Sequence, residues 1–119
     1  MAFVHRPSTT RTVEVSRPSA DRIAVNGALT FETARQAYEA GMRLLRDVAS
    51  NGEPLQVDLG GVTASDSAGL AVLIEWVAAA RRNGRAVRVL NVPGGIAASA
   101  RISEVDQILG FAPDRSRAT

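Results

Sequence analysis

The sequence has no cysteine, no lysine and a single histidine, and only 4% of its 119 residues are aromatic. Without cysteine, the chain can form neither a disulfide framework nor a thiolate metal site. His5 lies in the N-terminal segment, where it is a poor candidate for the base that a serine nucleophile needs. The chain also contains no G-x-S-x-G elbow and no lysine-containing phosphate loop. We therefore expect no catalytic residue, no metal and no cofactor.

Long apolar runs are absent as well. No run approaches the roughly 20 residues that a membrane-spanning helix requires. The first residues, MAFVHRPSTTR, contain no apolar signal segment. We expect a soluble, cytoplasmic protein without direct membrane insertion.

The charge pattern argues against a nucleic-acid partner, although the pI is about 10.4. All 14 basic residues are arginine, and six of them lie at or before Arg22 or after Pro113. Between Ile23 and Pro113, eight arginines stand against nine acidic residues. This interior is not basic, and no aromatic residues alternate with its arginines, so the usual features of nucleic-acid binding are missing.

The strand patterns predict one domain over residues 11–112, between flexible tails at 1–10 and 113–119. Apolar residues alternate in two short segments on either side of Pro18, which predicts a hairpin with its turn at this proline. Two further strands are predicted, so that the four segments are residues 12–15, 22–25, 55–59 and 86–90.

Helix signals occupy the stretches between and after these strands. Thr30 is the expected cap of the first helix, with Phe31 and Tyr38 on its apolar stripe. Two more helices are predicted at 67–82 and 96–101, and Ser103-x-x-Asp106 resembles a capping box for a final turn. The order β-β-α-β-α-β-α predicts an α/β layered sandwich, with its later strands parallel and joined by helical crossovers.

The helix at 67–82 carries more apolar residues than one face can hold. At about 100° per residue, one face contains the expected core residues Leu70, Leu73, Ile74, Val77 and Ala80. Trp76 lies about 100° from the centre of this face, and Val72 lies further round. Either another element covers Trp76, or the tryptophan is an exposed anchor for a protein partner. We expect Val72 and Trp76 to contribute to partner binding.

The start of this helix is the main candidate site. Ser67 lies at or next to the N-cap, where a hydroxyl can accept a hydrogen bond from a free backbone N–H. Asp66 adds negative charge at the positive end of the helix, and Gly69 leaves the first turn open to an approaching partner. Ser67 is then either a cap alone or a cap that also takes part in recognition. Phosphorylation there would add a charge of about −2.

The residues around Ser67 resemble a known family. Val57-Asp58-Leu59, followed by Val62 and by Asp66-Ser67-Ala68-Gly69-Leu70-Ala71, is similar to the signature of STAS domains, the fold of bacterial anti-sigma factor antagonists. The resemblance extends from Val13 to Phe111 and implies the STAS fold, an α/β fold in which helices cover one face of a mixed four- to five-stranded sheet. In the antagonists, a partner kinase phosphorylates the serine that matches Ser67, and this abolishes binding to that kinase. The expected partner-binding set is Asp66, Ser67, Ala68, Gly69, Val72 and Trp76.

Two branches of this family remain open. Segments 27–34 and 98–105 and the Asp-Ser-Ala-Gly-Leu-Ala helix start resemble the STAS subunit of the lipid-asymmetry (Mla) ABC transporter more than the antagonists. That branch implies a cytoplasmic adaptor that binds the transporter's ATPase subunit and reaches the inner membrane only through the complex. The alternative is an anti-sigma factor antagonist that binds an anti-sigma kinase and is switched by phosphorylation of Ser67.

Overall fold

A computed structural model describes residues 12–47, 53–102 and 109 of the chain. The predicted tails and the predicted Ser103-x-x-Asp106 cap lie outside this described part. The elements follow the predicted order along the chain: β1 (Val13–Ser19), β2 (Arg22–Leu29), α1 (Ala34–Asp47), β3 (Leu55–Ser65), α2 (Ser67–Arg82), β4 (Val87–Leu90) and α3 (Gly94–Ile102).

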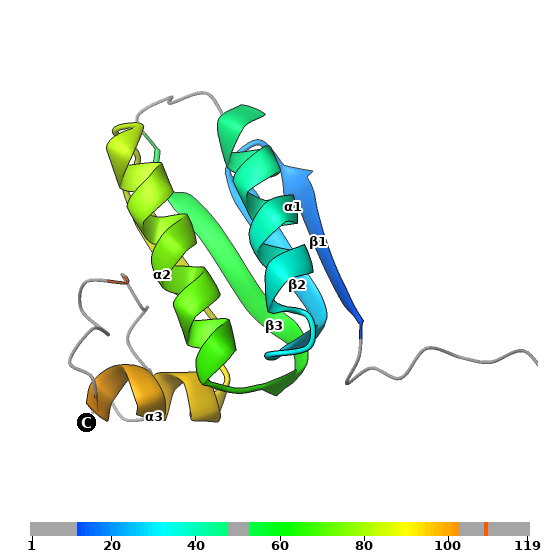
Figure 1. Ribbon diagram of the computed structural model, residues 1–119. Helices are drawn as coiled ribbons and strands as arrows, with labels where there is room; N and C mark the ends of the chain where they lie inside the picture. The colour runs from blue at the N-terminus through cyan, green and yellow to red at the C-terminus, as the bar shows by residue number, and fades with distance from the viewer. Residues whose placement is uncertain (1–11, 48–52, 103–108, 110–119) are drawn as a thin grey trace, which may run out of the picture.

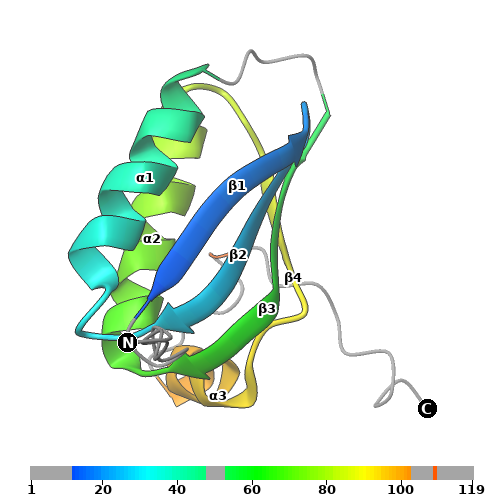
Figure 2. The same cartoon turned by 90° about the vertical axis from the view of Figure 1, so that its right-hand side faces the viewer.

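The four strands form one mixed sheet in the order β1-β2-β3-β4. β1 pairs with β2 in antiparallel fashion, whereas β2–β3 and β3–β4 are parallel pairs. Each parallel pair needs a crossover connection, and α1 and α2 supply these crossovers. Both helices cover the same face of the sheet, as Figures 1 and 2 show. The predicted mixed sheet with helices on one face is confirmed.

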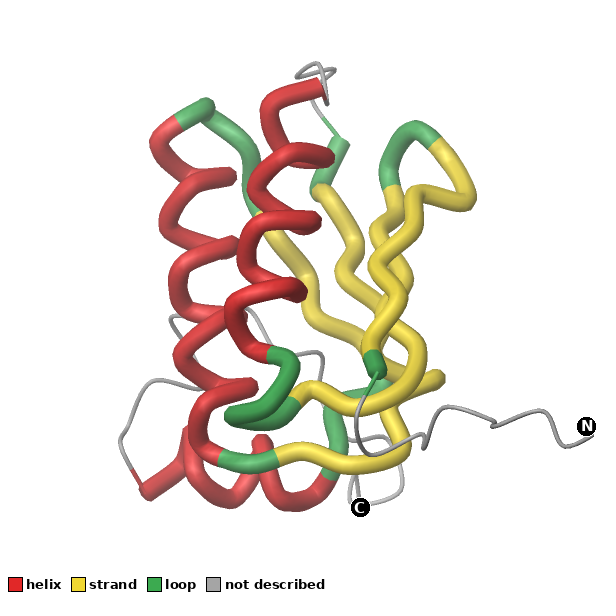
Figure 3. The backbone as a smooth tube through the Cα atoms, turned by 45° about the vertical axis from the view of Figure 1, so that its right-hand side comes forward, coloured by secondary structure: helices red, strands yellow, loops and turns green. Residues whose placement is uncertain are grey.

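The two long helices run side by side in the same direction (Figure 3). Both therefore begin at the same end of the sheet, where β2 and β3 end (Figure 1). α3 lies across this end and contacts α2. None of the helices within the described residues is both long and apolar enough to cross a bilayer.

The hairpin and β3 differ from the prediction in their bounds. Ser19 pairs with Arg22, so the turn falls at residues 20–21, and Pro18 lies inside β1 next to an irregularity in register. Proline is tolerated there because β1 is an edge strand. β3 continues through Gly60 and Gly61 to Ser65. A Cβ at Gly61 would collide with the side chain of Asn26, so glycine lets the strand continue past its neighbour.

The start of α1 also departs from the prediction. The helix begins at Ala34, and the residue directly before it is Thr33, not Thr30; the Thr33 carbonyl accepts from the Ala37 N–H at 2.9 Å. The Thr33 hydroxyl is buried, accepts from the Thr30 N–H at 3.0 Å and donates to the Ala28 carbonyl at 2.8 Å. Phe31 therefore precedes the helix and is 82% exposed, so its predicted place on the apolar stripe is wrong.

Two small residues lie at the centre of the buried face of α1. Ala37 and Gly41 are buried, and Leu45 closes the same row near the end of the helix, whereas Tyr38 is 37% exposed. Residues of this size allow a neighbouring helix to approach closely. The neighbour is α2, which makes the most extensive contact with α1 of any element.

The orientation of α2 corrects the prediction in part. Leu70, Leu73 and Val77 are buried as expected, but Ile74 is 38% exposed. Val72, Trp76 and Ala79, which were expected outside the core face, are also buried. The buried arc is wide because α2 packs on the sheet, on α1 and on α3 at once. Periodicity alone could not show which flank of the helix α1 would cover.

Candidate functional site

Asp66 joins two separate segments at the start of α2. Its Oδ1 accepts from the backbone N–H of Ala68 at 2.9 Å and from that of Gly69 at 3.4 Å. Its Oδ2 accepts from the N–H of Phe31 at 2.9 Å, across 35 residues of sequence. The N-cap of α2 is therefore Asp66. One carboxylate caps this helix and at the same time fixes the loop that precedes α1.

Ser67 is the first residue of α2, and it is exposed. It lies next to the N-cap, which is one of the two positions that the sequence predicted. Because Asp66 already accepts the N–H groups of the first turn, the Ser67 hydroxyl is not needed as a cap. Capping alone therefore does not account for a serine at this position.

Gly69 has a different role from the predicted one. It is buried, and a Cβ at this position would clash with the backbone carbonyl of Leu29 and lie 3.1 Å from the Leu29 Cγ. The group that approaches the open first turn is thus the end of β2 in the same chain. Gly69 lets α2 begin directly against the sheet, and it is not available to a partner.

The position expected for Val72, outside the core face, and the exposed alternative for Trp76 are also wrong. Their relative exposures are 5% and 2%. The indole of Trp76 lies against Gly41, and its Nε1 donates to the Tyr38 carbonyl at 3.3 Å. Of the two interpretations of Trp76, coverage by another element is the one that the structure supports. The tryptophan is a contact between α1 and α2 and cannot anchor a partner in this conformation.

Other residues form the surface at this end of the molecule. In the part of α2 nearest its start the exposed positions are Ser67, Ala71, Ile74 and Glu75, while Ala68 is half-buried. The loop before α1 adds Phe31, which sequence reasoning placed in the core. The row of small residues in α1, including Ala37 and Gly41, was the signal that could have identified its true buried face and left Phe31 outside it.

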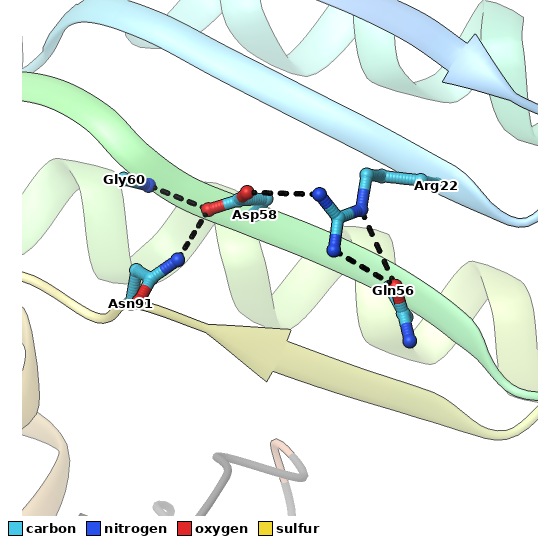
Figure 4. A network of polar contacts seen from close by, with 5 residues as sticks. All are labelled: Arg22, Gln56, Asp58, Gly60 and Asn91. Atoms are coloured by element: carbon cyan, nitrogen blue, oxygen red, sulfur yellow. Dashed lines mark hydrogen bonds and ion pairs between the residues drawn. The ribbon is translucent and has the colours of Figure 1, made fainter.

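A second polar group lies on the face of the sheet opposite to α1 and α2 (Figure 4). Asp58 Oδ1 accepts from the Asn91 side chain at 2.9 Å and from the Gly60 N–H at 2.8 Å. Its Oδ2 lies 3.4 Å from Arg22, which also donates to Gln56. The hydrogen bond from Asn91 is the largest cause that lowers the pKa of Asp58. The hydrogen bond from the Gly60 N–H and the charge of Arg22 lower this pKa further, while partial burial opposes them. This network connects β2, β3 and the end of β4.

Asp58 and Asp66 do not form a carboxylate pair. Asp58 points to the face of the sheet opposite to α1 and α2 (Figure 4), whereas Asp66 is bound to the start of α2 and to the loop before α1. Among the described residues, no group of three or more His, Asp or Glu side chains is arranged to hold a metal ion. The Asp58 network and the start of α2 are therefore two separate polar groups.

Comparison with known proteins supports the resemblance seen in the sequence. A family model described as the Mlab STAS domain matches residues 13–110. A search of curated proteins gives no significant match. Among solved structures, the chain is similar to a Thermotoga maritima protein that is provisionally assigned as an anti-sigma factor antagonist, with 15% identity and a TM-score of 0.59. The alignment covers 92% of this chain and 93% of that one. At this identity the likeness concerns the fold, and it confirms the predicted STAS fold.

Proposed function

The chain belongs to the STAS domain family of the Mlab type, and from this we propose that it is a non-catalytic adaptor that binds the ATPase of an Mla-type phospholipid-transport ABC system. It would act in the cytoplasm and reach the inner membrane through that complex. The proposed contact surface is the start of α2, with Ser67 and Ala68, together with the adjoining Phe31 loop.

One observation carries this proposal. The N-cap of α2 is Asp66, so the exposed Ser67 hydroxyl at the first helical position is not needed to cap the helix. A small, neutral, exposed side chain at a rigid helix start suits close contact with a partner surface. Val72, Trp76 and Gly69 are not part of the contact surface, because they are buried within the domain.

The test compares substitutions at Ser67. Ser67→Asp should keep the fold, because a carboxylate in the first turn is favoured by the helix dipole. It should nevertheless weaken binding to the ATPase, since the new charge must be desolvated at the contact. Ser67→Ala should change the free energy of unfolding by less than about 0.5 kcal/mol, because the cap is Asp66. Both properties can be measured by thermal unfolding and by calorimetric titration with the purified ATPase subunit.

A matched control is Ser19→Asp, which adds the same charge at an exposed position of the β1 edge strand. It should bind as the parent does. If Ser67→Asp also binds as the parent does, the start of α2 is not the contact surface. If the parent itself does not bind the ATPase, the adaptor proposal fails.

The exposed hydroxyl favours one second candidate, an anti-sigma factor antagonist switched at Ser67. A phosphate on the first residue of a helix is favoured by the helix dipole. Incubation with an anti-sigma kinase and ATP, followed by mass spectrometry, should then detect phosphate on Ser67 and loss of kinase binding. The antagonist is rejected if the parent neither binds such a kinase nor accepts phosphate.

A further inference from the structure

Phe31 is the most exposed aromatic side chain among the described residues, with 82% of its surface accessible. Phenylalanine is usually found inside a protein, because leaving its ring in water forgoes the favourable free energy of burial. Single exposed apolar residues are common on protein surfaces and need no special role. The position of Phe31 is distinguished by the way in which its backbone is held.

Two buried or charged groups fix the loop that carries this ring. The Phe31 N–H donates to Asp66 Oδ2 at 2.9 Å. One residue earlier, the Thr30 N–H donates to the hydroxyl of Thr33, which is itself 1% exposed and bonded to the Ala28 carbonyl. The backbone of Phe31 is therefore tied to both β2 and α2. An exposed ring on a fixed backbone loses little conformational freedom when a partner binds it.

Two carboxylates adjoin Phe31 in the described part of the chain. Glu32 follows it in sequence and is exposed, and Asp66 is bonded to its backbone. Arg35, four residues further along the chain, is exposed, but it pairs with Glu39 at 3.4 Å, which offsets its charge. An aromatic residue beside two carboxylates is complementary to an apolar pocket with a basic rim.

We propose that Phe31 is the anchor of the interface, and that it inserts into an apolar pocket with a basic rim on the transporter's ATPase subunit. This inference rests on the proposed adaptor function and names the residue that dominates its contact. Aromatic side chains that fill a pocket commonly dominate the binding energy of an interface, whereas the surrounding charges mainly set its specificity and rate of association.

The test is calorimetric titration of the purified ATPase subunit with the full chain and two variants. Phe31→Ala should weaken binding by at least about 30-fold, the loss that defines a dominant interface residue. The matched control is Ile102→Ala, because Ile102 is 84% exposed but lies on α3. It should bind within about threefold of the parent. Neither change should lower the melting temperature appreciably, because both side chains are largely in water.

The basic rim is tested separately. Raising the salt concentration should weaken binding, and Glu32→Arg should slow association of the two proteins. The matched control is Glu14→Arg on the β1 edge strand, which should leave the association rate unchanged. If binding is insensitive to salt and to Glu32→Arg, the proposal that the pocket has a basic rim is refuted.

The outcomes separate this inference from the adaptor proposal. If the parent binds the ATPase and Phe31→Ala binds equally well, the anchor is refuted while the adaptor proposal stands. An equal loss with Ile102→Ala also refutes it, because the effect would not be specific to Phe31. If the parent does not bind, the adaptor proposal and the anchor both fail.

Discussion

The contact between Gly41 and Trp76 gives a sharp test of how α1 and α2 pack. A Cβ added at Gly41 would lie 2.5 Å from Trp76 Cζ2, and still closer to Cε2 and Nε1. Real side chains do not approach so closely, so the indole or one of the helices must move. The Gly41→Ala variant therefore sets a gain in helix propensity against a loss in packing.

The sizes of the opposing free-energy changes predict whether Gly41→Ala is more or less stable than the parent. Replacing a helical glycine by alanine should stabilise the protein by up to about 1 kcal/mol. Overpacking a core costs about 1–3 kcal/mol. Displacing the indole also removes the hydrogen bond from Trp76 Nε1 to the Tyr38 carbonyl, which leaves a buried donor unpaired at about 1–3 kcal/mol. We expect a net loss of about 1–5 kcal/mol in the free energy of unfolding.

The assay is urea unfolding followed by tryptophan fluorescence, which reports on this contact because Trp76 is the single tryptophan of the chain. The control is Gly94→Ala, since a Cβ there would meet nothing within 4 Å. It should be neutral or slightly stabilising. A Gly41→Ala variant as stable as the parent would refute the close packing of the indole on α1.

Two further predictions concern the site and the sheet. Gly69→Ala should destabilise the protein by about 1–3 kcal/mol in urea unfolding, because its Cβ would clash with the Leu29 carbonyl; an unchanged midpoint would show that α2 does not begin against β2. Asp58→Asn should be less stable than the parent at neutral pH. Because folding lowers the pKa of Asp58, its stabilising effect is present above the ordinary value of 3.8 and is lost as the pH falls through the lowered value. The difference in melting temperature should therefore shrink below about pH 3.8; a constant difference would contradict this reasoning.

Local patterns in the sequence were sufficient to predict the order of elements and the parallel crossovers. Alternation of apolar residues located the strands, and the apolar residues of α2 correctly placed Leu70, Leu73 and Val77 in the core. The same patterns failed for Ile74 and Trp76, because helical periodicity gives a face but not the position of the neighbouring helix. The small residues of α1 bring that helix over Trp76, and Ile74 is left at the surface.

Long-range polar contacts were not predictable in this way. The sequence around Asp66 indicated a helix start, but nothing local indicated that its carboxylate also holds the Phe31 N–H, 35 residues away. Arg85 is a similar case. Its side chain is 4% exposed and pairs with Asp21 at 2.9 Å, across 64 residues of sequence. Composition alone would place such an arginine in solvent.

The hydrogen bond between Asp66 and the Phe31 N–H has a consequence for how long the protein persists in a cell. Because the loop before α1 and the start of α2 meet only when the intervening β3 is in place, the unfolded chain does not possess this surface. A ligand that recognises it binds the folded state alone and raises the free energy of unfolding by mass action, by about 2.7 kcal/mol at a concentration 100 times its dissociation constant. Copies in a complex would then resist proteolysis longer than free copies, and the amount of the protein would follow the amount of its partner.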